Sequence, residues 1–535
     1  MPEIALGDSS NADETRGLAR NASIIALGNI ASRGLGFVRE SVKSRLFGTG
    51  PQVDALNLAI AIPLQIYDLV TGGLVNSALV PAFSEYTPPA RRAELWRLAS
   101  ILLTLAALVI SALLAGLMVL APQVVALFAW VGGLAGGATH PQSLSTATQL
   151  LRLTLPAVLF LSLSGILTGL LYALQRFTLP ALTAAVFNAS MVLMALALGA
   201  RYGVAAMALG LLVGAVLQVL LQLPALRDGL IALRPQLSLR HPGLRRILKA
   251  YVPIIVSLLV NQIGVNFGLS VAFGFEHGLS WMGYATNLYQ FPLGLVGVAV
   301  SAAILPTLAA QASGALAGAY KTTLARGLSL VLALMIPATV GMFVLAEPIV
   351  ALAFQGGQFT AADTLMTAQV LRWFLLGLSF AAIDLLLINA FYAQHDTFTP
   401  SSVGVVTIVL YIAVVFLARP ALGLLSLMLA DSLKQIAHAL ICGALLSRRI
   451  GGFGGAGLWR ALGKIALAAL GMAALVWAVL FGVNALGLPD ALPRHALAVF
   501  LPGGAGVLAY FALAARLGLS DVQQFISLLR QKLRV

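Results

Sequence analysis

The charged side chains most able to do chemistry lie near the amino terminus, in two segments that are otherwise apolar enough to lie in a membrane. The motif SRGLGFVRE contributes Arg33, Arg39 and Glu40, and the next apolar segment contains Asp54 and Asp68. Charges at membrane depth are costly, so residues that keep them there are candidates for function. Because a guanidinium can hold phosphate oxygens with two parallel hydrogen bonds, we interpret Arg33 and Arg39 as candidate binding groups for an anionic substrate.

The spacing within this motif also permits a structural interpretation. Residues seven apart share one face of a helix, so Arg33 and Glu40 can close a helix contact as an ion pair. Arg39 points elsewhere unless the helix bends at Gly28, Gly34 and Gly36. A third interpretation is that Arg39, Glu40 and their basic neighbours form the hydrated end of the helix. Two arginines against one acid leave a positive excess, which favours the substrate site.

The other acidic residues differ in their local surroundings. Asp54 follows the turn at FGTGPQ, where a carboxylate can cap a helix or serve as a gate or ion-pair partner. Asp68 and Asp384 lie inside apolar segments with no cation nearby in sequence, so we interpret them as candidates for coupling to protons or Na⁺. Asp431 and Lys434 are three residues apart, and this spacing predicts a structural ion pair.

Motifs for catalysis are lacking. The sequence contains no GxxxxGK[ST] phosphate loop and no HExxH, and its six histidines are scattered over different segments. The single cysteine, Cys442, can form no internal disulfide. We therefore expect no catalytic residues, no bound metal, no cofactor and no ATP hydrolysis by this chain. An ion gradient or the membrane potential is the expected source of energy.

The composition indicates the class of protein. Hydrophobic residues make up 60% of the 535 positions and charged residues only 9%, against about a quarter in average soluble domains. The net charge of +14 is spread over short connections rather than gathered in one basic domain. This pattern indicates contact with membrane lipids rather than with nucleic acid.

Apolar runs bounded by Gly, Pro and charged residues predict an all-α polytopic membrane protein with about fourteen transmembrane helices. The predicted spans are 23–47, 53–82, 95–120, 146–172, 178–200, 203–224, 246–275, 280–310, 323–346, 366–392, 399–418, 421–447, 458–483 and 493–515. Alternate connections then carry 22 Lys and Arg on the side of both termini, against five on the other side. This contrast predicts that both termini are cytoplasmic.

An internal repeat divides the chain. LYALQRFTLP ends at Pro180 and FYAQHDTFTP ends at Pro400, and two further pairs of similar segments recur in the same order. Six helices in each half predict two lobes related by a parallel repeat, with two further helices after them. The predicted parts are a cytoplasmic tail (1–22), an N-lobe (23–224), a basic linker (225–245), a C-lobe (246–447), two last helices (448–515) and a second cytoplasmic tail (516–535). The linker is either a solvated loop or a contact with anionic lipid.

Several of these motifs resemble the MurJ/MviN family. The run SRGLGFVRE, then RLFGTG, Asp54 and ALVPAFSEY, is similar to that family's amino-terminal signature, and 280–309 and 391–400 resemble its later motifs. The resemblance extends from about residue 23 to the carboxyl end. It implies a lipid II flippase of the multidrug/oligosaccharidyl-lipid/polysaccharide exporter superfamily in a bacterial plasma membrane, with two six-helix lobes and two extra helices. By the motif, Arg33 and Arg39 correspond to cavity arginines and Asp54 to a first-loop aspartate of the family.

Other positions depart from the family pattern. Tyr67 and Asp68 stand where two consecutive arginines are usual, Asn287 stands in place of an arginine, and Asp384 stands in place of a lysine. The leading hypothesis is a flippase for lipid II or a similar polyprenyl-linked glycan, working by alternating access. The alternatives are a cation-coupled exporter of amphipathic drugs or of another lipid-linked polysaccharide, and a membrane scaffold or enzyme for lipid-linked substrates. Cell-wall synthesis proteins are the further partners to be expected.

Overall fold

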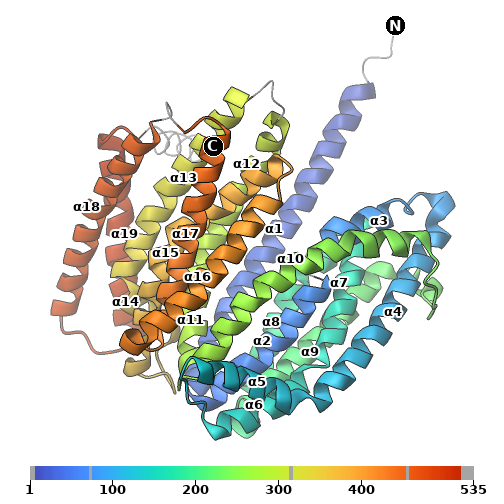
Figure 1. Ribbon diagram of the computed structural model, residues 1–535, viewed down its shortest axis with the longest axis horizontal. Coiled ribbons are helices and arrows are strands. Elements are labelled where there is room, and N and C mark those ends of the chain that lie inside the picture. Colours follow the sequence, from blue (N-terminus) through green and yellow to red (C-terminus); the bar gives the residue numbers. More distant parts are fainter. Residues whose placement is uncertain (1–5, 72–74, 313–316, 454–456, 520–535) are drawn as a thin grey trace. The chain divides into compact units, whose positions relative to one another are not determined.

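A computed structural model describes residues 6–71, 75–312, 317–453 and 457–519 (Figure 1). The described chain is almost entirely helical and contains no strand. The helices of its first part are α1 (Leu6–Phe47), α2 (Pro51–Thr71), η1 (Val75–Leu79), α3 (Val80–Ser84), η2 (Pro89–Arg91), α4 (Arg92–Val119), α5 (Ala121–Leu134), α6 (Pro141–Thr154), α7 (Ala157–Ala173), α8 (Thr178–Tyr202), α9 (Ala205–Gln222), η3 (Leu223–Leu226), η4 (Leu230–Ala232) and α10 (Pro242–Phe273). The later helices are α11 (Gly278–Pro292), η5 (Leu293–Val298), α12 (Ala299–Gln311), α13 (Ala317–Val344), α14 (Ala346–Phe354), α15 (Ala361–Ala393), α16 (Phe398–Leu422), α17 (Leu425–Arg449), α18 (Leu458–Ala485) and α19 (Leu492–Arg516).

The chain forms two compact units, which are described separately. Unit 1 comprises Met1–Leu279 and holds the helices up to α10, and unit 2 comprises Ser280–Val535 and holds α12 to α19 with most of α11. The lobe and linker boundaries proposed from the sequence stay a prediction.

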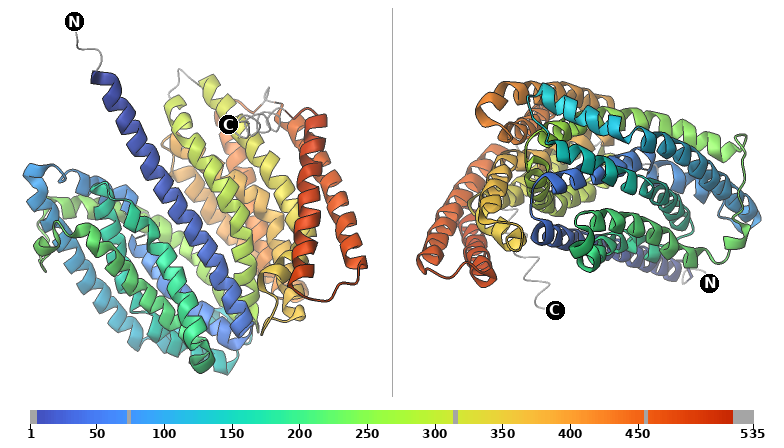
Figure 2. Two further views of the ribbon diagram at one scale, coloured as in Figure 1. Left: turned by 180° about the vertical axis from the view of Figure 1, so that it is seen from behind. Right: turned by 90° about the horizontal axis from the view of Figure 1, so that it is seen from below.

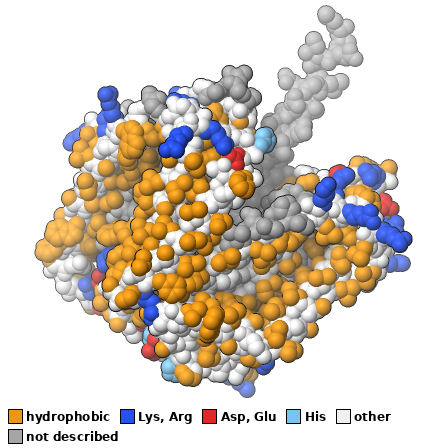
Figure 3. All heavy atoms as spheres, in the orientation of Figure 1, with side chains coloured by type: hydrophobic (Ala, Val, Ile, Leu, Met, Phe, Trp, Pro, Cys, Tyr) orange, Lys and Arg blue, Asp and Glu red, His pale blue; other side chains and the backbone are white. Residues whose placement is uncertain are grey.

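The predicted membrane spans coincide with observed helices. Within the described residues, twelve helical stretches are long and apolar enough to cross a membrane. The predicted first and seventh spans fall on α1 and α10, which are also long but contain more polar residues. On the visible faces, hydrophobic side chains cover the flanks of the helices, and on unit 1 Lys and Arg gather at the end that carries α3 (Figure 3). The protein is therefore a multi-pass membrane protein.

The first, second and eighth predicted spans differ from the observed helices. The first helix begins at Leu6 rather than at residue 23, because a helix does not end where its apolar stretch ends and residues 6–22 contain no proline. The spans predicted at 53–82 and 280–310 are each interrupted, since π-helical turns occupy η1 and η5. Such turns lie beside the similar segments ALVPAFS and AILPTLA, and they often mark functional positions in helices.

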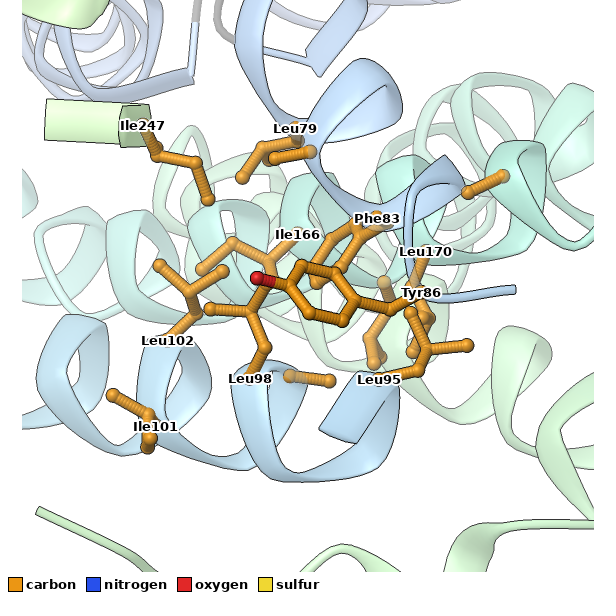
Figure 4. Packing of buried hydrophobic residues seen from close by; sticks show 14 of the residues in the cluster. Leu79, Phe83, Tyr86, Leu95, Leu98, Ile101, Leu102, Ile166, Leu170 and Ile247 are labelled. Carbon is orange, nitrogen blue, oxygen red and sulfur yellow. The ribbon is translucent and has the colours of Figure 1, made fainter. Parts of the chain in front are cut away.

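One hydrophobic cluster of unit 1 lies where η1 and α3 meet α4, α7 and α10. Leu79 and Phe83 are fully buried against Leu98 of α4 and Leu170 of α7, and Ile247 of α10 closes the same cluster (Figure 4). Packing of this kind fixes the positions of helices inside a lipid bilayer, where burial from water contributes little between helices.

The last two helices belong to unit 2. Helices α18 and α19 pack together, and α18 packs along α13 (Figures 1 and 2). The hydroxyl of Tyr510 on α19 donates a 2.6 Å hydrogen bond to the carbonyl oxygen of Ala333 on α13. Trp477, Phe481 and Phe500 are exposed on these helices, as expected for lipid-facing side chains.

The sequence repeat appears as repeated local structure. Helices α7, α8 and α9 correspond to α15, α16 and α17 with a constant offset of 220 residues at the end of α7, at both ends of α8 and at the start of α9. The turns share a residue at φ 60°, Gln175 in unit 1 and His395 in unit 2. Gly203 and Gly423, both at φ 55°, end α8 and α16 in the same way. The duplication predicted from the sequence is thus confirmed for these three helices.

Candidate functional site

A close contact between α1 and α8 positions the amino-terminal arginines. Gly28 of α1 lies so near α8 that a Cβ atom there would be 2.4 Å from the carbonyl oxygen of Ala181. Further along the pair, the side-chain amide of Asn188 on α8 donates to the carbonyl oxygen of Ser32 on α1. Because Gly28 has no side chain, the following turns of α1 can pack directly on α8.

Arg39 is held in place by two polar partners. Its Nη1 donates a 2.8 Å hydrogen bond to Oδ1 of Asn188, and its Nη2 lies 2.8 Å from Oε1 of Glu40. The guanidinium side chain is long enough to reach the neighbouring residue around the helix, although Arg39 and Glu40 lie on different faces. Arg39 is partly exposed, at 21% of its side chain, so part of the guanidinium stays accessible.

Glu40 continues this network toward α2. Lys43 lies 2.5 Å from Oε2 of Glu40 and donates a 2.9 Å hydrogen bond to Oδ1 of Asn57. Asp54, in the first turn of α2, is buried and near enough to Lys43 to act on its charge. These buried charges therefore compensate one another, as burial in a membrane protein requires.

Arg33 stands apart from the network. Its side chain is exposed, and it has no hydrogen-bond or ion-pair partner among the side chains that the structure describes. The Arg33–Glu40 pair considered from the helix spacing does not form, because Glu40 is occupied by Arg39 and Lys43. Arg33 is therefore an accessible cation on the same helix as the network.

Asp68 is not brought to these residues. It lies 14 residues after Asp54 on α2, a distance of about 21 Å along an ideal helix. Its side chain is exposed, and the described residues supply no ion-pair partner for it.

Asp384 belongs to a cluster in unit 2. On α15, Gly377 lies so close to α17 that a Cβ atom would be 2.7 Å from Cα of Ser432. Two turns further, Oδ1 of Asp384 is 2.6 Å from Nδ1 of His438. Cys442 follows one turn later on α17, with Sγ 3.7 Å from the same nitrogen. The expectation that the histidines and the cysteine are not clustered is wrong here, because packing of α15 on α17 brings distant residues together.

The local pair predicted in the same helix is confirmed. Lys434 lies 2.6 Å from Oδ1 of Asp431, and its ammonium group stands 5.4 Å from the centre of the Tyr411 ring. Asp431 is therefore balanced within its own helix.

Three contributors were missed in the sequence. Asn57, Asn188 and His438 lie in apolar segments, and only their polarity at membrane depth marks them. Intramembrane polar residues of this kind bind their partners across helices, so spacing along one segment does not reveal them.

The arrangement of helices defines the class first. A solved inward-facing structure of a multidrug resistance MATE family transporter of the MOP superfamily is similar to this chain with a TM-score of 0.66, 17% identity, and coverage of 79% of this chain and 95% of that one. A solved structure of a lipid II flippase MurJ in an inward closed conformation is similar with a TM-score of 0.75 and 24% identity, and the match covers 92% of this chain and 98% of that one. The chain thus has the same fold as these two solved membrane transport proteins.

Sequence comparison defines the family. The model of the family "Lipid II flippase MurJ" matches residues 43–494. The lipid II flippase MurJ of Burkholderia cenocepacia is 30% identical over 385 residues, which are 70% of this chain and 73% of that protein. The chain belongs to the MurJ family of lipid II flippases, which are transport proteins of cell-wall biosynthesis.

Proposed function

We propose that this protein translocates lipid II, the undecaprenyl-pyrophosphate-linked precursor of peptidoglycan, from the inner to the outer leaflet of a bacterial plasma membrane. Family membership supports the substrate, and the two-unit construction supports alternating access. Both termini lie in the cytoplasm in this proposal, as the distribution of Lys and Arg favours. In this proposal, proteins that synthesise the precursor act before the transporter on the inner face of the membrane, and proteins that use it act after the transporter on the outer face.

The main support for the substrate-binding site is that the side chain of Arg33 is exposed. Arg33 has no described partner, whereas the neighbouring charges from Glu40 to Asp54 are compensated. A pyrophosphate bears several anionic oxygens, and a free guanidinium can bind two of them side by side. Arg39, kept partly accessible by Asn188 and Glu40, supplies the second cationic group.

Glu40 and Asp54 have a supporting role in this account. Together with Lys43 they link α1 to α2. A change in the distance between these helices would change the position of Glu40, and therefore the ion pair that orients Arg39. Substrate binding at the arginines is thereby connected to the position of α2. This is how Glu40 and Asp54 would act as gating residues rather than as substrate ligands.

Complementation of a strain depleted of its own flippase tests the proposal. The wild-type protein is expected to restore growth and the exposure of lipid II at the outer leaflet, and Arg33→Ala is expected to restore neither at equal protein levels. Arg45→Ala is the matched control, since Arg45 is an exposed cation in the last turn of the same helix. Full rescue by Arg33→Ala would remove Arg33 from the site, and no rescue by the folded wild-type protein would contradict the function.

A further inference from the structure

The cluster around Asp384 has a counterpart in unit 1 at the corresponding positions of the repeat. Subtracting the offset of 220 residues from Asp384, His438 and Cys442 leads to Ser164, Gln218 and Gln222. The hydroxyl of Ser164 donates to Oε1 of Gln218 at 3.2 Å, and Nε2 of Gln222 donates to the same hydroxyl at 2.7 Å.

All six residues are at most 8% exposed, so both clusters are buried. The duplicated fold therefore keeps a polar contact at this point in both units, but only unit 2 makes it from groups that change charge.

The hydrogen bonds of His438 fix its protons. Nε2 lies 3.1 Å from the carbonyl oxygen of Pro400 on α16, and a carbonyl oxygen can only accept, so Nε2 carries a hydrogen. Nδ1 lies 2.6 Å from Oδ1 of Asp384, which requires one more proton between these two atoms. That proton makes either an imidazolium beside a carboxylate or a neutral imidazole beside a carboxylic acid, and the total charge is zero in both cases.

Loss of this proton would leave two acceptors facing each other. The one hydrogen left on His438 can then bond only one acceptor, so either Asp384 faces the lone pair of Nδ1 or the carbonyl oxygen of Pro400 faces that of Nε2. One net negative charge also remains in a buried position. The contacts of His438 with both α15 and α16 are therefore kept together only when the proton is present.

The surrounding groups do not replace this proton. Helix α17 adds Cys442 beside Nδ1 and the mutually compensated Asp431 and Lys434, and the described parts of α12 and η5 bring no titratable group. Within the described residues, His438 is the ion-pair partner of Asp384. The remaining titratable groups on the packed helices are Asp363, Arg372 and Tyr392 on α15, Tyr411 and Arg419 on α16, Tyr320, Lys321 and Arg326 on α13, Glu347 on α14, and Arg448 and Arg449 at the end of α17.

A bound metal ion fits this geometry less well. The three potential ligand atoms lie within 4.8 Å of one another. Two ligands at 2.0–2.1 Å from a tetrahedral zinc ion are, however, about 3.3 Å apart, whereas the oxygen of Asp384 and the nitrogen of His438 are only 2.6 Å apart. The distance is that of a hydrogen bond.

We propose that Asp384 and His438 form a proton-binding site in unit 2 that couples proton movement to the conformational cycle of the transporter. This inference rests on the proposed function for the transported substrate, but the binding of the proton itself does not. One proton passes from water to the pair and later back to water, and no other bond is made or broken. With the proton bound, His438 holds α17 to both α15 and α16 as observed, and after its release one of these two contacts is lost.

A variant that gives unit 2 the side chains of unit 1 tests proton binding without the lipid. In the triple variant Asp384→Ser, His438→Gln, Cys442→Gln, the hydrogen-bonded contact is kept and the titratable groups are removed. Infrared difference spectra between two pH values, recorded on the purified full-length protein in lipid, should contain a carboxyl or imidazole signal that the triple variant lacks. The matched control Ser164→Ala should keep the signal. His438→Gln alone serves as a second variant if the triple variant is not monodisperse.

The coupling is tested in proteoliposomes that contain lipid II. A pH difference of one unit across the membrane should change the wild-type rate of translocation by up to tenfold, which is the limit for one proton per cycle. The rate of the triple variant should not change. An unchanged infrared signal in the triple variant, or an undiminished response to the pH difference, would overturn the proposal. Stoichiometric binding of Zn²⁺ that Cys442→Ala abolishes would overturn it in favour of a metal site. Proton binding without any translocation of lipid II would instead leave this site standing and contradict the proposed function.

Discussion

Arg39 on α1 donates a 2.8 Å hydrogen bond to the side-chain oxygen of Asn188 on α8. Asn188 is itself fixed by hydrogen bonds from its amide to the carbonyl oxygens of Ser32 and Ala184. The direction of the guanidinium is therefore set by a residue 149 positions away in sequence. A substrate site that contains Arg39 depends on α8 as much as on its own helix.

Replacement of Asn188 should weaken the site without removing its charge. A hydrogen bond to a charged group contributes about 1.5–3 kcal/mol, so Asn188→Ala should reduce lipid II translocation by about tenfold or more. Asn188→Asp should reduce it as well, because a carboxylate would neutralise Arg39. Translocation rates of reconstituted protein measure both effects, and equal rates for all three proteins would show that Arg39 needs no orientation.

Glu40 should be important for stability. Removing one partner of a buried ion pair leaves an uncompensated charge and costs about 3–5 kcal/mol, so Glu40→Gln should lower the unfolding temperature clearly because it leaves Lys43 buried. Arg97→Gln is the control, since the Arg97–Glu94 pair is exposed and its loss should cost at most about 1 kcal/mol. Similar thermal stabilities for the two variants would mean that water reaches Lys43.

Gly377 should not tolerate even a methyl group. In an ordinary helix Gly→Ala is stabilising by about 0.5–1 kcal/mol, but at Gly377 the new Cβ would meet α17 at 2.7 Å. Gly377→Ala should therefore lower the unfolding temperature. Gly443→Ala, where the nearest atom is the flexible end of Leu387 at 3.7 Å, should leave it unchanged or raise it. A stabilising effect at both positions would contradict the close approach of α15 and α17.

Asp396 should make the stability of the turn between α15 and α16 depend on pH in the acidic range. The backbone N–H and the hydroxyl of Thr399 donate to its carboxylate and lower its pKa to about 2. Because the folded-state pKa lies below the unfolded value of about 3.9, this stabilisation is present above about pH 4 and is lost as the pH falls toward 2.

Asp396→Asn should accordingly lower the free energy of unfolding at pH 7 by at most about 1 kcal/mol, because asparagine still accepts from Thr399 but loses the charge that pairs with Arg449. It should also abolish the loss of stability between pH 4 and 2 that comes from this turn. Thermal unfolding at several pH values measures the difference between the two proteins. A constant difference over that range would contradict the contribution of the carboxylate.

Much of the fold followed from the sequence because membrane spans are recognised by their length and apolarity. The fourteen predicted spans fall on observed helices, and the match of LYALQRFTLP with FYAQHDTFTP revealed a turn that recurs with the same backbone conformation at Gln175 and His395. The helical residues of α1 before residue 23 and the π turns could not be predicted from the sequence, since neither feature changes the hydropathy pattern.

The candidate site could be predicted from the sequence only in part. Arg33, Arg39 and Glu40 were marked by their charge, but the partner of Glu40 was set by the reach of Arg39 and by Lys43 rather than by the spacing of seven. Asp384 was recognised as an acid without a neighbouring cation, yet its partner His438 lies 54 residues away. Cross-helix contacts of this kind depend on packing at single residues such as Gly28 and Gly377.

Translocation of lipid II by the purified protein in proteoliposomes, read from the fraction of lipid II that an impermeant probe can reach, tests the proposed function and the role of Arg33 together. We predict translocation by the wild-type protein and by Arg45→Ala, and its loss in Arg33→Ala at equal incorporation. Failure of the wild-type protein to move lipid II, or undiminished translocation by Arg33→Ala, would contradict this prediction.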